Sequence, residues 1–232
     1  MQNFVGFNER TFQFFCDLRQ NNNKPWFEVN RPIYEENVFT PLRALVEDLG
    51  PFMHMLDPQF DVRPQVNRTI SRIYRDTRFS ADKSLFRDHL WIVFRRHQGV
   101  LSDELCYYFE IREQDFSYGM GFYSAPREWM VSLRQRILAN PTKFLRIAEN
   151  PVLKENFILD GERYIRPAVK DYPPELAEWV KFKTFYYHRQ EAVVPAATSA
   201  GLIDLLKEGF LILYPMYCYC QNLPPQVKVE FK

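Results

Sequence analysis

The sequence predicts an α+β fold with an antiparallel sheet. Helix-period stretches fill the first 50 residues, strand-period stretches follow between residues 62 and 123, and mixed elements complete the chain. A chain of 232 residues can bury a core without disulfides or metal. We therefore expect a single α+β domain over residues 1–232, with one weak seam near residue 150.

Two helices are expected before the sheet. Asn8 is a suitable N-cap for a short apolar stripe over residues 12–18. A longer stripe over residues 33–49 keeps the helical period, and Gly50-Pro51 should end it. Pro41 inside that stripe should kink the helix or split it in two.

Alternating and β-branched residues then predict a three-stranded meander, with a fourth strand over residues 66–73. Gly119 and Gly121 alternate on one strand and leave a face without side chains, which either another backbone or a ligand could approach. The expected strands of the meander cover residues 89–94, 105–111 and 116–123.

The second half mixes helices and strands. Helices are expected from Ser124-Ala125-Pro126, after Pro141 and after Pro173-Pro174, and a strand over 184–187. Asp160-Gly161 predicts a two-residue hairpin turn within residues 157–165. A closing helix should cover residues 201–213.

Composition narrows the function classes. The formal net charge of +1 argues against a dedicated nucleic-acid coat or a polybasic membrane binder. The first residues lack the basic and apolar regions of a signal peptide, and no apolar run reaches the ~20 residues of a membrane span. The cysteines lie in apolar surroundings without disulfide or zinc spacing. We expect a cytoplasmic protein with no membrane partner, no metal and no cofactor.

Common catalytic motifs are missing from the sequence. It has no phosphate-binding loop, dinucleotide fingerprint, paired-histidine zinc motif or serine-nucleophile elbow. The four histidines stand far apart, so histidine catalysis requires tertiary proximity.

A charged block between residues 72 and 87 is the most distinctive feature. Residues 61–97 hold nine Lys/Arg and four Asp/Glu, a net charge of +5, and the block carries most of that excess. Guanidinium forks bind phosphate and carboxylate bidentately, and neighbouring aspartates can orient them or act as bases. The block's cations are Arg72, Arg75, Arg78, Lys83 and Arg87, beside Asp76, Ser80 and Asp82.

Two interpretations of this block stay open. In the first, Arg75, Arg78 and Lys83 hold a phosphate or carboxylate, with Asp76 or Asp82 orienting them or serving as a catalytic group. In the second, the aspartates pair with the arginines and fix a long loop over the sheet. Whether the protein is an enzyme is undecided at this stage.

The segment Asn21–Phe27 is the second unusual feature. Its asparagines and Pro25 favour a turn, and Trp26-Phe27 should anchor that turn in the core. Alternatively, Asn22 and Trp26 form a wall of the same anion pocket.

Two other partner classes remain possible on the sequence. An aromatic surplus of 21 Phe, 13 Tyr and 4 Trp could supply a homodimer interface. Aromatics interleaved with arginines over residues 91–96 could stack single-stranded nucleic acid, although the alternation equally fits a strand with one core face. We rank nucleic-acid binding third.

Taken together, these segments resemble the family known as domain of unknown function 2461, over nearly the whole chain. The resemblance rests on Asn21-Asn22 with Trp26-Phe27, on Arg72, Arg75-Asp76, Arg78-Phe79-Ser80 and Asp82-Lys83-Ser84, on Pro126 with Arg134, and on Arg166-Pro167 and Lys181-Phe182-Lys183.

This chain departs from the family pattern at two places. It has Ser84-Leu85-Phe86-Arg87 where the family continues Ser-Pro-Tyr-Lys, and its strand before Pro126 is less rich in glycine. The resemblance implies a compact α+β protein, and we add Arg134 from the matched residues to the candidate ligand-binding residues. It implies no particular activity, substrate or cofactor.

Overall fold

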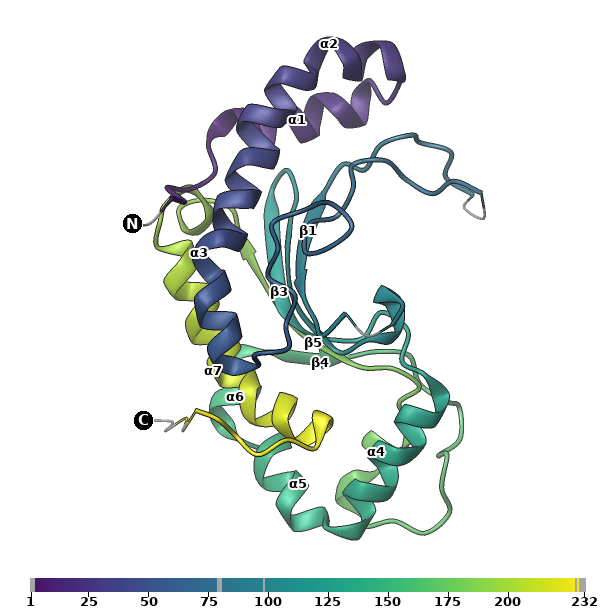
Figure 1. Ribbon diagram of the computed structural model, residues 1–232. Helices are drawn as coiled ribbons and strands as arrows, with labels where there is room; N and C mark the ends of the chain where they lie inside the picture. The colour runs from purple at the N-terminus through teal and green to yellow at the C-terminus, as the bar shows by residue number, and fades with distance from the viewer. Residues whose placement is uncertain (1–2, 79–80, 98, 228, 230–232) are drawn as a thin grey trace. The chain divides into compact units, whose positions relative to one another are not determined.

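The computed structural model describes residues 3–78, 81–97, 99–227 and 229 (Figure 1). The α+β prediction is confirmed, because an open antiparallel sheet of five strands is combined with helices. The strand order is β1-β2-β3-β5-β4, so the first three strands form the predicted meander. The strands are β1 (Leu90–Phe94), β2 (Cys106–Ile111), β3 (Asp115–Gly121), β4 (Ile158–Asp160) and β5 (Tyr186–Ala192).

The helices lie before the sheet, between β3 and β4, and after β5. Short 3-10 turns at Leu101–Asp103, Pro174–Leu176, Trp179–Lys181 and Ala196–Thr198 join some of these elements. The α-helices are α1 (Glu9–Gln20), α2 (Lys24–Tyr34), α3 (Thr40–Leu56), α4 (Arg127–Ala139), α5 (Pro141–Ala148), α6 (Pro151–Asn156) and α7 (Leu202–Gln221).

The chain forms two compact units, each built from three separated segments. Unit 1 comprises Met1–Phe94, Tyr108–Tyr118 and Gln190–Lys207. Unit 2 comprises Arg95–Tyr107, Gly119–Arg189 and Glu208–Lys232. None of these boundaries lies near residue 150, where the sequence suggested a seam. The expectation of a single domain stays a prediction.

In unit 1, the first helix follows the prediction and the second begins earlier than expected. The Asn8 side chain accepts a hydrogen bond from the Thr11 amide, which confirms the predicted cap. The predicted turn at Asn21–Phe27 is wrong in its second half, because Asn23 caps α2 through the Trp26 amide. Pro25 then occupies the first turn of α2, where its missing N–H costs no hydrogen bond.

Pro41 divides the long helix, as predicted. A π-helical turn at Glu35–Phe39 precedes it, and Pro41 cannot donate to the Asn37 carbonyl. The Thr11 hydroxyl donates to that carbonyl instead, at 2.5 Å. Gly50-Pro51 does not end α3, contrary to the prediction. Leu49, Met53 and Leu56 are almost fully buried, and their packing outweighs the cost of proline.

The segment over residues 66–73 is not a strand. It makes only isolated bridges, one of them between Ile70 and Ile92 of β1. The bare face at Gly119 and Gly121 is occupied by another backbone. A β-carbon on either glycine would collide with the chain at residues 185–188. Backbone approach, and not a ligand, therefore accounts for these two glycines.

The predicted hairpin over residues 157–165 is wrong. β4 pairs antiparallel with β5, through Ile158 opposite His188, and not with the residues after Gly161. A two-residue type I′ turn needs positive φ at both central residues, and Asp160 does not have it, although Gly161 has φ +147°. The segment after it instead bonds to residues 181–183, through the Tyr164 amide and the Glu162 carbonyl.

The core of unit 2 is aromatic, and its last helix is longer than expected. The ring centre of Phe144 lies 4.7 Å from that of Trp179, in an edge-to-face arrangement, and 5.2 Å from that of Tyr219. α7 continues to Gln221, eight residues beyond the predicted end. The Leu223 amide donates to the Cys218 carbonyl and the Asn222 amide to the Tyr219 carbonyl, with Asn222 at φ +54°. This pair of bonds is a Schellman motif, which ends α7.

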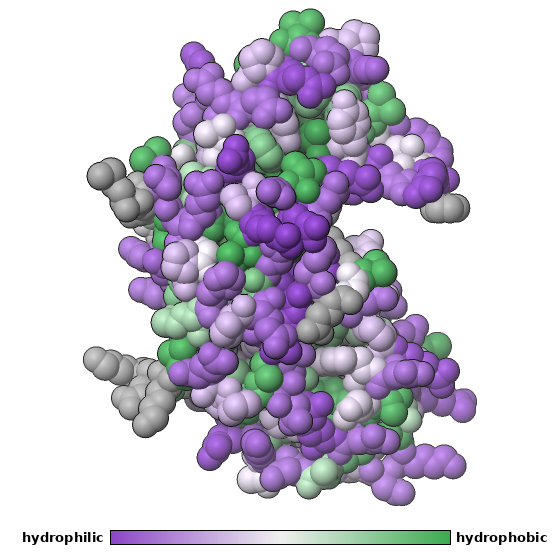
Figure 2. All heavy atoms as spheres, viewed as in Figure 1, coloured by the Kyte–Doolittle hydropathy of each residue, from purple (hydrophilic) through white to green (hydrophobic). Residues whose placement is uncertain are grey.

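On the face shown in Figure 2, hydrophilic residues predominate and hydrophobic ones occur in small groups. Exposed apolar residues such as Val29 and Ile165 are far apart in the sequence. Within the described residues, none of the helices has the length and apolar character needed to cross a membrane.

Candidate functional site

The charged block forms an arm of unit 1, defined here as residues 72–87. Its two legs are joined by an antiparallel bridge between Tyr74 and Phe86. The Arg75 amide donates to the Leu85 carbonyl at 2.9 Å, and the Arg87 amide donates to the Ile73 carbonyl at 2.8 Å. Figure 1 shows the two legs running beside each other.

The arginines of the arm are paired with its aspartates. Arg78 binds Asp76 bidentately, with N–O distances of 3.0 and 2.7 Å. Arg75 binds Asp82 at 2.6 Å. The hydrogen bond from the Arg78 side chain holds the pKa of Asp76 well below its usual range. Bonds from Ser84, and the Arg75 charge after them, lower the pKa of Asp82. Both candidate catalytic groups are therefore ionised ion-pair partners and not poised bases.

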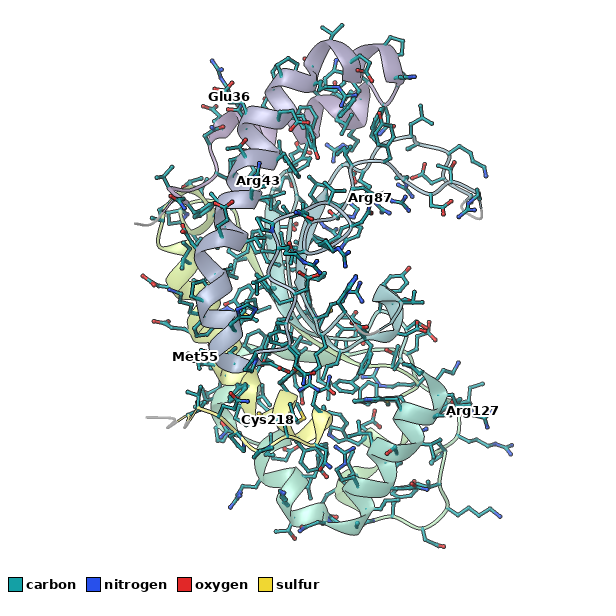
Figure 3. All side chains as sticks on the ribbon, in the orientation of Figure 1. Glu36, Arg43, Met55, Arg87, Arg127 and Cys218 are labelled. Atoms are coloured by element: carbon teal, nitrogen blue, oxygen red, sulfur yellow. The ribbon has the colours of Figure 1, made fainter. Side chains whose placement is uncertain are left out.

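The other cations of the arm have different surroundings. The Lys83 ammonium donates to the Thr77 carbonyl at 2.9 Å. Arg72 is exposed, and its charge contributes to the lowered pKa of Asp76. The Arg87 guanidinium, labelled in Figure 3, lies 4.7 Å from the ring centre of Trp91. Ser80 lies outside the described residues.

Asn22 clasps the arm from inside unit 1. Its amide nitrogen donates to the Phe86 carbonyl and its oxygen accepts from the Phe86 amide, both at 2.9 Å. Phe86 also stacks on Phe27, with ring centres 4.3 Å apart. These contacts satisfy one backbone residue completely and bury its side chain, so they give Asn22 a structural role.

Trp26 makes other contacts than Asn22. It lines a separate hollow of about 170 Å³ together with Phe14, Asn30 and Ile33. Its ring lies 5.8 Å from that of Phe14 on α1. The two side chains thus make different contacts, and the expected wall of Asn22 and Trp26 around one anion site stays a prediction.

Arg134 belongs to unit 2, where α4 buries it to 4% exposure. It donates to the Phe182 carbonyl at 2.8 Å, and burial lowers its pKa. This bond ties α4 to the segment before β5. Arg134 therefore makes a buried contact within unit 2.

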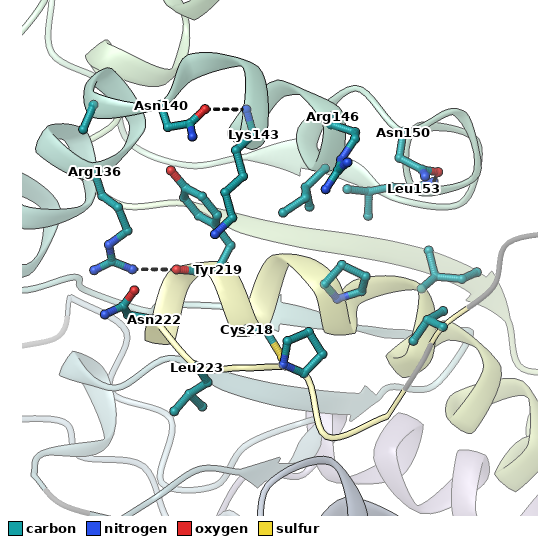
Figure 4. Close-up of a pocket in the computed structure, with 16 residues that line it drawn as sticks. Arg136, Asn140, Lys143, Arg146, Asn150, Leu153, Cys218, Tyr219, Asn222 and Leu223 are labelled. Carbon is teal, nitrogen blue, oxygen red and sulfur yellow. Dashed lines mark hydrogen bonds between the residues drawn. The ribbon is translucent and has the colours of Figure 1, made fainter.

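Unit 2 contains a larger cavity that the sequence did not single out, called here the α5–α7 pocket (Figure 4). Its volume is about 600 Å³, and it lies between α4, α5, α6, α7 and the chain after α7. No carboxylate or imidazole occurs among its described lining residues. They are Arg136, Ala139, Asn140, Lys143, Arg146, Ile147, Asn150, Leu153, Ile212, Pro215, Cys218, Tyr219, Asn222, Leu223, Pro225 and Val229.

Two of the pocket's cations have no counter-charge among the residues that the structure describes. Lys143 and Arg146 stand three residues apart on α5, so they share one helix face. Figure 4 shows both side chains projecting from α5 toward α7. Among the described residues, neither forms an ion pair. The Asn140 side chain caps α5 through the Lys143 amide at 3.0 Å, which fixes the start of this helix.

Arg136 anchors the wall opposite α5. It donates to the carbonyls of Tyr219 and Cys220 at 2.5 and 3.2 Å, and so satisfies oxygens left open at the end of α7. The Tyr219 residue is 7% exposed, and its buried hydroxyl has no hydrogen-bond partner among the described atoms. Burying a hydroxyl without a hydrogen-bond partner costs about 1–3 kcal/mol of folding free energy. The Tyr219 hydroxyl is therefore a polar group of the lining that could still form a hydrogen bond.

A local excess of basic residues in the sequence indicates this pocket, but it is not visible when charges are summed over long regions. Between Glu128 and Glu149, residues 129–148 contain four Lys/Arg and no Asp/Glu. Summed over residues 98–232, the charge is close to neutral, so this excess disappears in the total. A window of about 20 residues, placed on the two helices around Pro141, would have revealed it.

No group of three or more His, Cys, Asp or Glu side chains among the described residues could hold a metal ion. Cys218 and Cys220 are buried on α7, and neither forms a disulfide with another described cysteine. Burial raises the pKa of the Cys220 thiol to about 12, so it stays protonated and unreactive at neutral pH.

Comparison with known protein families gives a match. The family described as "Conserved hypothetical protein (DUF2461)" matches residues 10–219, which cover both the arm and the α5–α7 helices. No curated protein matches the chain.

Proposed function

The chain belongs to the conserved hypothetical family DUF2461. We propose that this member of the family binds a small anionic ligand in the α5–α7 pocket. The observation that carries the proposal is the charge of the lining. The described residues that line this cavity of about 600 Å³ include three cations and no carboxylate. This volume lies within the ~300–1,000 Å³ typical of small-molecule sites.

The two sets of cations differ in what an anion would have to displace. On the arm, an incoming anion would compete with Asp76 and Asp82 for Arg78 and Arg75. In the pocket, Lys143 and Arg146 have no ion-pair partner among the described residues that an anion would have to displace. Charge-assisted hydrogen bonds are about twice as strong as neutral ones. A paired cation already makes such a bond and would have to break it, whereas an unpaired cation forms a new one when it binds an anion.

The proposal concerns binding only. General acid–base catalysis needs a group that titrates near neutral pH, and the described lining offers no imidazole or carboxylate. The Cys218 side chain reaches the lining, but the residue is only 3% exposed.

A crystal soaked in sulfate, with selenate as an anomalous marker, tests this proposal. We expect an ordered anion within hydrogen-bond distance of Lys143 and Arg146. An anion at Arg75 and Arg78 instead, with the pocket empty, would move the function back to the arm. A soak that labels neither place at high anion concentration would refute the proposal.

A structural role is the second candidate function for the arm. The Arg78–Asp76 and Arg75–Asp82 pairs and the Asn22 clasp favour it, because each satisfies a group of the arm from within unit 1. The homodimer and the nucleic-acid surface stay predictions from the sequence.

A further inference from the structure

We propose that the ligand of the α5–α7 pocket is an amphiphile, with one anionic group on an apolar body, and not a small, fully polar anion. This inference rests on the proposed function and narrows its ligand class. It follows from the size of the pocket, from the separation of charged and apolar lining, and from the origin of each wall.

The pocket is too large for a single oxyanion. A volume of about 600 Å³ suits a ligand of drug size, whereas a phosphate held by Lys143 and Arg146 would leave most of it to water. Apolar walls in contact with that water are unfavourable, and an apolar ligand body would displace it.

Most apolar residues of the lining come from other elements than the two unpaired cations. The cations are on α5, which also supplies Ile147, whereas α6, α7 and the following chain supply Leu153, Ile212, Pro215 and Leu223. Figure 4 shows Lys143 and Arg146 on the side opposite Leu223. A ligand with a charged head at α5 and an apolar body against α7 complements both walls at once.

The sequence of α7 explains why its wall is available. Pro215 lies inside the helix and has no N–H for the Leu211 carbonyl, so the helix cannot be regular there. Ile212 and Pro215 are both only partly buried, although the neighbouring residues Leu213, Tyr214 and Met216 are buried. Two apolar side chains of a largely buried helix are therefore left to face the pocket.

Isothermal titration calorimetry with straight-chain carboxylates from butanoate to decanoate tests the inference. Each carboxylate is kept below the concentration at which it aggregates. We expect affinity to rise about two- to fourfold for each added methylene, as burial of a CH₂ group predicts. The primary alcohol of octanoate's length should bind at least about tenfold more weakly, because it cannot use the cations.

Two variants keep the outcomes distinct. Leu223→Ser should flatten the dependence on chain length while leaving butanoate affinity within about twofold, because it alters only the apolar wall. Lys143→Gln with Arg146→Gln should weaken every carboxylate and leave the alcohol unchanged. Thermal unfolding of each variant checks that it is folded.

Three results would overturn the inference in different ways. If inorganic phosphate and butanoate bind as tightly as octanoate, the site takes small polar anions, and the proposed function survives without the amphiphile. If the alcohol binds as tightly as octanoate, the pocket recognises apolar bodies and the anion proposal fails. If no carboxylate and no phosphate binds, both proposals fail together.

Discussion

The arm and the α5–α7 pocket each gather basic residues, but within the described part of the chain only the arm pairs them with carboxylates. Arg75 and Arg78 meet Asp82 and Asp76 within 2.6 and 2.7 Å. Lys143, Arg146 and Arg136 line a pocket that has no described carboxylate. The difference teaches that charge density alone does not mark an anion site. The count of opposite charges within reach of each cation is the more useful measure.

A second contrast lies in what holds each region together. The arm is fastened by an aromatic contact and a side-chain clasp at Phe86, and its ion pairs lie toward the exposed end. The pocket is framed by helix caps and by the Arg136 bonds to the end of α7. The following predictions separate these contributions.

Phe86→Ala should have the largest effect on stability. The side chain is 1% exposed and stacks on Phe27, so its removal should cost about 3–5 kcal/mol of unfolding free energy. Urea denaturation followed by tryptophan fluorescence measures the change. The neighbouring exposed residue offers a matched control, since Leu85→Ala should stay within about 0.5 kcal/mol of wild type. Equal losses of unfolding free energy in both variants would show that the contact between Phe86 and Phe27 does not stabilise the arm.

Asn22→Ala should rank next. It leaves the amide and the carbonyl of Phe86 without their partner, which should cost about 1–3 kcal/mol. Asn22→Asp keeps an acceptor for the Phe86 amide but sets a carboxylate against the carbonyl, so it should also be destabilised. Amide hydrogen exchange at Phe86 should speed up in both variants. Unchanged exchange in Asn22→Ala would contradict the clasp.

Asp76→Asn should have the smallest effect, because its pair with Arg78 is exposed to solvent. The thermal midpoint at pH 7 should match wild type within error. The folded-state pKa of Asp76 is depressed, so any stability from the pair is complete above the ordinary aspartate pKa of about 3.9 and is lost only as the pH falls through the depressed value. Carboxyl NMR should therefore find Asp76 still ionised at pH 3.5. A normal titration would contradict the bidentate pair.

The sequence predicted those features that depend on neighbours along the chain. The Asn8 cap, the split at Pro41 and the three strands of the meander each follow from residues within one element. The hairpin at Asp160-Gly161 failed because β4 pairs with a strand 26 residues further along, where Asp160 lies opposite Tyr186. Local turn chemistry cannot reveal such a competing partner.

The candidate site shows the same limit. The sequence placed Asp76 and Asp82 beside the arginines, but it could not decide between ion pairing and an open pocket, because that depends on the path of the arm. It missed Lys143 and Arg146 because regional charge sums hid a local excess. The apolar wall that faces them comes from α7, some 70 residues later in the chain, and only the tertiary fold brings the two together.

Titration of octanoate into three proteins tests most directly the claim that the anion site lies in the pocket and not on the arm. The proteins are wild type, the pocket variant Lys143→Gln with Arg146→Gln, and the arm variant Arg75→Gln with Arg78→Gln. We predict that affinity falls about tenfold or more in the pocket variant and stays within about twofold of wild type in the arm variant. A loss confined to the arm variant would contradict this account.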